Sequence, residues 1–207
     1  MKIIEKRSRG RPRLLDREHA LEVALQLFWR YGYEGTSIAE LTAAMGITPP
    51  SLYAAFGSKD ALYRAALDRY EASYGGYAAR ALTEEPRVRD AVARMFREAV
   101  AVYAAGREPL GCMLAAGAVM CAPEHKDVTA DLARRRSAVI AMIKDRFDRA
   151  VADEELAPST DTAALAAFCA AVIQGLSIQA RDGTDRGLLE AVAATALSAW
   201  PGAADGR

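Results

Sequence analysis

The stretch from Thr36 to Lys59 constrains the fold more than any other part of this 207-residue chain. It reads TSIAELTAAMGITPPSLYAAFGSK, and its apolar residues recur at helical spacing on both sides of a glycine. Ser37 and Glu40 form a capping box that opens the first segment, and Gly46 ends it. The pattern predicts two short helices joined by a tight turn, with a third helix starting at Ser58. This is the spacing of a helix-turn-helix, whose second helix can lie in the DNA major groove.

The second helix of this unit is expected from Pro49 or Pro50 to Ala55. Prolines are tolerated in a first turn, but the residue before a proline resists the helical region, so either Thr48 or Pro49 can be the cap. Leu52 and Phe56 turn inward. The residues left mostly outward are Pro49, Pro50, Ser51, Tyr53 and Ala54.

A basic arm precedes the helices. The first thirteen residues hold six Lys or Arg residues against one acid, a local charge of +5, whereas the whole chain is neutral. Arg9, Arg11 and Arg13 alternate with Gly10 and Pro12, a pattern that can enter a minor groove. The alternative is a solvated tail without a partner.

No strand-like alternation stands out, and alanine is abundant, so we predict an all-α fold. Residues 1–14 form the flexible arm, 15–62 a three-helix DNA-binding head, 63–200 a helical effector-binding and dimerisation domain, and 201–207 a disordered tail. In the second domain we expect a helix that fades at residues 75–76 or continues to about 82. After it we expect an amphipathic run from 88 to 103, a short helix over 111–121, a long helix over 124–151 and two apolar helices over 161–180 and 185–199.

Composition narrows the functional class. The chain has three cysteines without a CxxC pair and no secretion signal, so we expect free thiols in the cytoplasm. No run is long and apolar enough to span a bilayer. His19 and His125 lack a second ligand at metal spacing, so no metal or other cofactor is expected. No phosphate loop, Ser/His/Asp set or paired carboxylates can be proposed, so we expect no enzyme.

Residues 10–64 resemble the DNA-binding head of TetR-family transcriptional regulators, and the layout resembles that family over nearly the full length. The residues that carry the resemblance are Gly10–Arg13, Ala24, Leu27, Phe28, Tyr31–Tyr33, Thr36–Ala39, Leu41, Ala44, Gly46, Ile47, Ser51–Tyr53, Phe56–Lys59 and Leu62. The resemblance implies a homodimer, a repressor or more rarely an activator, that binds a palindromic operator and leaves it when a small effector binds the C-terminal domain.

The resemblance also implies roles for single residues. Thr48, Pro49, Pro50 and Ser51 would start the reading helix, with Ser51 hydrogen-bonding to bases and the prolines touching thymine methyls. Tyr53 would place its hydroxyl on a phosphate. Thr36, Ser37 and Lys59 lie at helix N-termini that favour an anion. Ala54 and Ala55 replace larger polar residues common in the family, which favours shape readout.

Two further sets follow from the same resemblance. The family's effector cavity would be lined by Phe96, Val100, Tyr103, Met113, Met120, Met142, Ile143, Phe168, Val172 and Gln174. Because these residues are mostly apolar, they favour an apolar or amphipathic effector, although plain core packing is the alternative. The last two helices would form a four-helix dimer contact through Ala166, Ala167, Ala170, Ala171, Gly175, Leu189, Ala193 and Leu197.

Two rival functions stay open. A thiol-based redox regulator would use Cys112, Cys121 or Cys169, although no basic residue beside them in sequence signals a lowered pKa. A catalytic helical protein is the other rival, and it lacks a recognisable constellation of residues.

Overall fold

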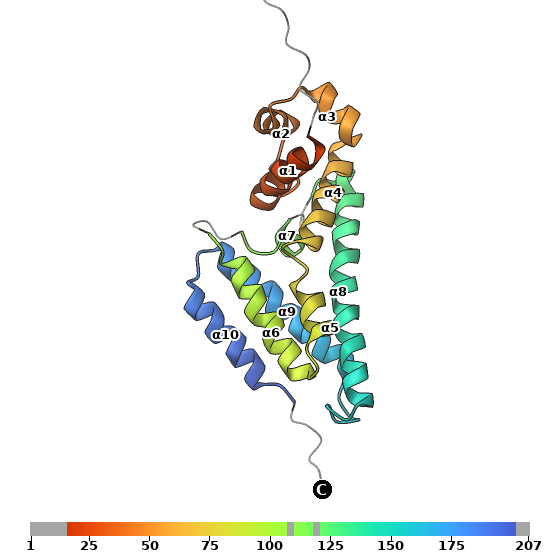
Figure 1. The fold of residues 1–207 in the computed structure, drawn as a ribbon, viewed down its shortest axis with the longest axis vertical. Coiled ribbons are helices and arrows are strands. Elements are labelled where there is room, and N and C mark those ends of the chain that lie inside the picture. The colour runs from red at the N-terminus through yellow and green to blue at the C-terminus, as the bar shows by residue number, and fades with distance from the viewer. Residues whose placement is uncertain (1–15, 107–109, 118–120, 202–207) are drawn as a thin grey trace, which may run out of the picture.

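The computed structural model describes residues 16–106, 110–117 and 121–201, and within them every regular element is a helix. A small head stands above a helical bundle, and the chain's last helix lies at the edge of that bundle (Figure 1). The helices in order are α1 (Arg17–Tyr31), α2 (Ile38–Met45), α3 (Pro49–Phe56), α4 (Lys59–Ala72), α5 (Tyr77–Glu84), α6 (Val88–Tyr103), α7 (Met113–Ala116), the 3-10 turn η1 (Pro123–His125), α8 (Lys126–Ala152), α9 (Thr162–Arg181) and α10 (Arg186–Ser198). The all-α prediction is confirmed.

Local caps fix the helices of the head. Asp16 caps α1 by accepting hydrogen bonds from the backbone N–H groups of Glu18 and His19. Ser37 and Glu40 form the predicted capping box at α2. The cap of α3 is Thr48, one of the two alternatives, with both prolines in the first turn. Leu52 and Phe56 are buried, as predicted.

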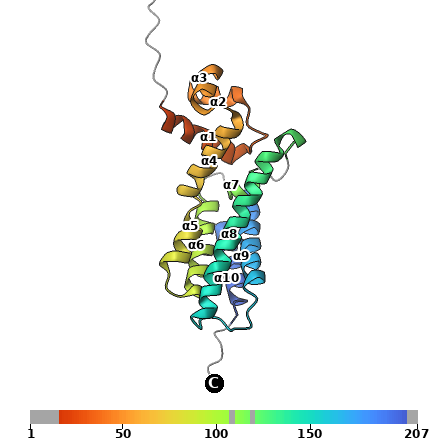
Figure 2. The same cartoon turned by 90° about the vertical axis from the view of Figure 1, so that its right-hand side faces the viewer.

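α4 belongs to both parts of the molecule. It begins beside the head and runs down into the bundle, next to α8 (Figure 2). The proposed domain boundary after residue 62 therefore falls inside this helix. α4 ends at Ala72, and a separate helix, α5, begins at Tyr77.

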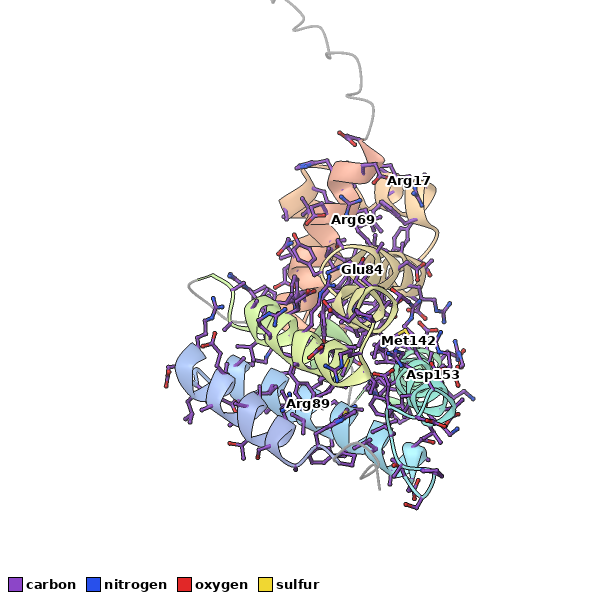
Figure 3. The ribbon with its side chains drawn as sticks, turned by 60° about the horizontal axis from the view of Figure 1, so that its bottom comes forward. Arg17, Arg69, Glu84, Arg89, Met142 and Asp153 are labelled. Carbon is purple, nitrogen blue, oxygen red and sulfur yellow. The ribbon has the colours of Figure 1, made fainter. Side chains whose placement is uncertain are left out.

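Ion pairs hold α4 on both sides. Arg69 donates to the carboxylates of Glu18 and Glu22 on α1, at 2.8 and 2.7 Å (Figure 3). Toward α8, Arg135 pairs with Asp68 and Glu71 of α4. The head is thereby tied to the long helix of the bundle.

The bundle core lies between α6, α8 and α9, and α10 packs on α6 and α9. The short helix predicted over 111–121 is wrong in length, because α7 covers only residues 113–116. Gly111 has φ +65°, a left-handed conformation that a helix does not contain. The next residue is fixed to α9, because the Cys112 N–H donates to the Ser177 hydroxyl at 2.7 Å. The arm residues Arg9, Arg11 and Arg13, Met120 and most of the tail lie outside the described residues.

Candidate nucleic-acid interface and effector cavity

α3 presents the predicted outward face. Thr48, Pro49, Pro50 and Ser51 are exposed at its N-terminal end. The hydroxyls of Thr48 and Ser51 lie 3.0 Å apart, so each holds the other in place. α3 carries no charged side chain. Its exposed face can therefore offer hydroxyl hydrogen bonds and apolar contact, but no ionic contact.

Two residues frame α3 on its exposed side. Tyr53 is 46% exposed, so its hydroxyl is free to reach a neighbouring molecule. Arg17 starts α1 and places its guanidinium 5.0 Å from the centre of the Phe56 ring (Figure 3). Sequence reasoning missed Arg17, although its position directly after the basic arm was a signal for it.

The N-terminus of α2 differs from the prediction. The Thr36 side chain is fully buried, and its hydroxyl donates to the Gly32 carbonyl at 2.8 Å. That hydroxyl is thus a structural group of the head. Ser37 is exposed, but its N–H and hydroxyl both donate to the Glu40 carboxylate at 2.7 Å. The helix N-terminus expected to attract an anion is therefore already occupied by the Glu40 carboxylate.

Lys59 is half-buried at the start of α4. Its ammonium lies 4.2 Å from the centre of the Tyr33 ring. Burial lowers the pKa of Lys59, against the opposing effect of the nearby carboxylates of Glu34 and Asp60. The tyrosine hydroxyl in turn donates to Asp60. Lys59 is therefore part of a polar cluster at the base of the head, with only part of its surface facing outward.

A cavity of about 60 Å³ lies inside the bundle, below the head. Of the nine predicted lining residues that the structure describes, Tyr103 and Gln174 line it. The others on its wall were missed: Tyr70, Gly75, Tyr77, Ala78, Cys112, Leu114, Ala115, Arg136, Val139, Ala170 and Ile173. Tyr70 in the last turn of α4 and Tyr77 at the start of α5 were a signal for it, because a buried phenol needs a polar neighbour.

Three tyrosines give the cavity its polar character. The hydroxyls of Tyr77 and Tyr103 are hydrogen-bonded to each other at 2.5 Å. Within the described residues the Tyr70 hydroxyl makes no hydrogen bond of ordinary geometry, although the residue is fully buried. Burial raises the pKa of Tyr70 well above its usual range, so this hydroxyl stays protonated. Its nearest polar groups are the Cys112 thiol and the backbone of Met113, which also affect its pKa.

The remaining predicted lining residues lie elsewhere. Phe96 and Val100 face α10 rather than the cavity. Met113 and Ile143 are buried core residues, and Met142 is half-buried on α8. Phe168 and Val172 line an open apolar groove between α9 and α10. The sequence placed these residues on the correct helices but on the wrong helix faces.

The predicted dimer residues differ in their burial within the single chain. Four of them are packed inside the chain: Ala166, Ala170, Leu189 and Ala193. Gly175 and Leu197 are half-buried, and Ala167 and Ala171 are exposed. We define the α9/α10 face by the large exposed apolar side chains Phe168, Ile178 and Leu188, which are 42%, 44% and 54% exposed, together with Ala167 and Ala171.

Two family models match this sequence. Residues 20–66 match the bacterial regulatory proteins of the tetR family, and residues 89–196 match the tetracyclin repressor-like C-terminal domain. The chain belongs to the TetR family of bacterial regulators.

Relatives within the TetR family cover nearly the whole chain. The HTH-type transcriptional repressor ComR of Escherichia coli K12 is 36% identical over 95% of this chain and 94% of its own. BdcR, a repressor from the same organism, is 32% identical over the same shares. A cysteine-substituted CifR, solved with a 26-base-pair double-stranded operator, is 45% identical over 92% of this chain and all of its own, with a TM-score of 0.88.

The cysteines of this TetR-family chain are free thiols. Burial raises the pKa of Cys169 to about 12, and burial together with Glu34 raises that of Cys121. Neither forms a thiolate readily at neutral pH, which argues against both as redox sensors. Cys112 differs because it lines the cavity.

Other ligand chemistry has little support in the part of the chain that the structure describes. No group of three or more His, Cys, Asp or Glu side chains is arranged there to hold a metal ion. The expectation that no run is long and apolar enough to span a bilayer is wrong for α9, the one described helix that meets that criterion, although a helix in a protein core meets it too.

Proposed function

We propose that this TetR-family chain is a homodimeric transcriptional repressor that binds a palindromic operator through α3 of each subunit and leaves it when a small effector enters the cavity. The observation that carries the proposal is the exposed, uncharged face of α3 within a capped helix-turn-helix. The operator complex of CifR, which is 45% identical to this chain, supports DNA as the partner.

In this proposal the contacts divide by type. Ser51 and the two prolines touch base edges, since hydroxyls and apolar groups can read the major groove. Tyr53 and Arg17 bind phosphates on either side. The arm residues Arg9, Arg11 and Arg13 supply the salt-dependent attraction that α3 lacks.

The α9/α10 face supports the homodimer. A second copy would cover Phe168, Ile178 and Leu188, which are otherwise large apolar groups in water. A two-fold axis then places the two α3 helices to meet the two halves of a palindrome, about one DNA turn apart or a small multiple of it.

The cavity supports a small effector. At about 60 Å³ it is well below the roughly 300–1,000 Å³ of pockets for drug-sized ligands. Its wall is mainly apolar, with tyrosine hydroxyls, a thiol, Gln174 and Arg136 as its polar groups. This composition suits a small apolar or amphipathic molecule that accepts or donates one or two hydrogen bonds.

Selection of bound fragments from genomic DNA tests the proposal. We expect recovered fragments to share a palindrome, with footprints that cover both halves and an affinity that falls steeply with salt. Deletion of residues 1–12 should flatten that salt dependence. If no fragment is protected at modest ionic strength, the proposed function is wrong.

A thiol-based regulator remains the second candidate, and it rests on Cys112 alone because this thiol lines the cavity. Mild oxidant would then release the operator from the parent protein and from Cys121→Ser and Cys169→Ser, but not from Cys112→Ser. Release from all four proteins would exclude this candidate.

A further inference from the structure

One aromatic residue of the head contacts a residue of the cavity wall and the loop residue that precedes another. Trp29, in the last turn of α1, is only 6% exposed. Its ring meets the Tyr70 ring edge to face, with the centroids 4.9 Å apart. Its indole N–H donates to the Gly111 carbonyl at 3.0 Å, across the boundary between head and bundle.

One partner of Trp29 lines the cavity, and another is bonded to a residue that does. Tyr70 lies on its wall, and its buried hydroxyl makes no hydrogen bond of ordinary geometry within the described residues, so a ligand that bonds to this hydroxyl acts on the ring that touches Trp29. Gly111 directly precedes Cys112, a second wall residue. A ligand that displaces Cys112 therefore moves the carbonyl that holds the indole.

The surroundings leave Gly111 little freedom to absorb such a movement. A Cβ added at Gly111 would lie 2.5 Å from the Ser177 carbonyl, so the loop is pressed against α9. From the same helix, Arg181 donates to the carbonyl oxygens of Trp29 and Arg30 at 3.3 and 2.6 Å, at the end of α1 where a cation is favoured. The end of α1 is thus fixed to the elements that enclose the cavity.

We propose that Trp29 transmits occupancy of the Tyr70–Cys112 cavity to the DNA-binding head. This inference rests on the proposed function and adds the route by which the two sites are coupled. A ligand bound to Tyr70 or pressing on Cys112 changes the position of Trp29, and α1 carries that change to α2 and α3. Coupling of this kind requires that the ligand favours one arrangement of the junction over the other.

The test uses a cavity-filling substitution in place of the unidentified effector. Ala78→Leu fills the cavity from α5, opposite α7, and Val139→Phe fills it from α8. Ala93→Leu is the matched control, because Ala93 is a half-buried alanine that lines the groove between α6 and α10 instead. Thermal melts identify any variant that does not fold, in which case the other filling variant is used.

Operator affinity is measured on a selected genomic fragment, with and without Trp29→Phe, which keeps a ring but removes the indole N–H. We expect Ala78→Leu to weaken binding about fivefold or more, within the usual range of allosteric coupling. In the Trp29→Phe background the same substitution should weaken binding less than about twofold, and Ala93→Leu should have little effect in either. Equal weakening by Ala78→Leu in both backgrounds overturns the inference.

Trp29 also serves as its own reporter. The chain has two tryptophans, so Trp200→Phe leaves Trp29 as the sole indole. We expect its emission to shift on addition of operator DNA and on introduction of Ala78→Leu, but not with Ala93→Leu. Operator binding with unchanged Trp29 emission would contradict this inference but not the proposed function. If the protein bound no fragment, the proposed function itself would be wrong.

Discussion

Ser51 and Tyr53 are exposed side chains of α3 with different surroundings. The Ser51 hydroxyl is held 3.0 Å from that of Thr48 and is exposed at the N-terminal end of the helix. Tyr53, two residues on, is exposed on a helix without charge. In the proposed operator complex the first reads a base and the second reaches a phosphate.

Ser51→Ala should therefore change base preference, because it removes a hydrogen bond worth roughly 1–3 kcal/mol of discrimination at one position. Tyr53→Phe should weaken binding to all operators by a similar factor, because phosphates carry no sequence information. Operators varied one base pair at a time distinguish the two effects. If Ser51→Ala leaves both affinity and preference unchanged, α3 is misplaced in the proposal.

At the same scale, Glu22 predicts a pH dependence of stability. The Gln26 amide donates to its carboxylate, and Arg69 donates at 2.7 Å, which together lower the pKa of Glu22 despite partial burial. A carboxylate with a lowered pKa stabilises the fold above its ordinary pKa, and this contribution is lost as pH falls through the lowered value.

Glu22→Gln should accordingly reduce the free energy of unfolding at pH 7 by about 0.5 kcal/mol, since the ion pair is about one-third exposed. The difference from the parent should shrink as pH falls through the lowered pKa of Glu22 and disappear below it. Urea unfolding at several pH values measures it, with the exposed Glu190→Gln as control. A difference that persists undiminished in acid contradicts the assignment.

At the scale of the element, helix starts were predictable because their caps are local. Asp16, Ser37, Ser58, Asp161 and Asp185 all accept hydrogen bonds from first-turn N–H groups. α7 was not predictable in the same way. Its apolar neighbours read as one helix, but contacts with α9, distant in sequence, hold Gly111 in a non-helical conformation.

Gly111→Ala tests this account of the loop. A Cβ there meets Ser177 at 2.5 Å in a backbone with φ +65°, so we expect a loss of about 2–4 kcal/mol in the free energy of unfolding. Gly183→Ala has φ +91° but open space around the added carbon, so it should cost only about 1 kcal/mol. Denaturant unfolding measures the free energy of unfolding of both variants. Equal losses would show that the contact with Ser177 adds nothing to the cost of Gly111→Ala.

At the scale of the whole molecule, the sequence predicted which helices carry the cavity-lining residues and the proposed dimer contact, but not which of their side chains are buried and which are exposed. α9 is apolar around most of its circumference, so periodicity cannot say which side meets α6 and which meets solvent. Contacts between helices determine which side is buried. On α10, packing against α6 buries Leu189 and Ala193 and leaves Leu188 exposed.

Phe168→Glu should therefore separate the proposed dimer, because it places a charge in the middle of the α9/α10 face. Sedimentation would show a monomer, and operator affinity would fall by about a hundredfold or more as the two half-sites lose their linkage. Tyr31→Glu, at an exposed aromatic in the head, should leave the oligomeric state unchanged. A dimer that survives Phe168→Glu requires a different interface.

The unbroken α4 has a mechanical consequence. Its fourteen residues span about 21 Å, from the foot of the head to the last turn that holds Tyr70. A tilt of about 5° along such a rod displaces its upper end by about 2 Å. In the proposed dimer, two α4 helices that tilt in opposite directions would double this change in the distance between the two heads. A ligand of very few atoms could therefore shift the heads enough that they no longer match a rigid duplex.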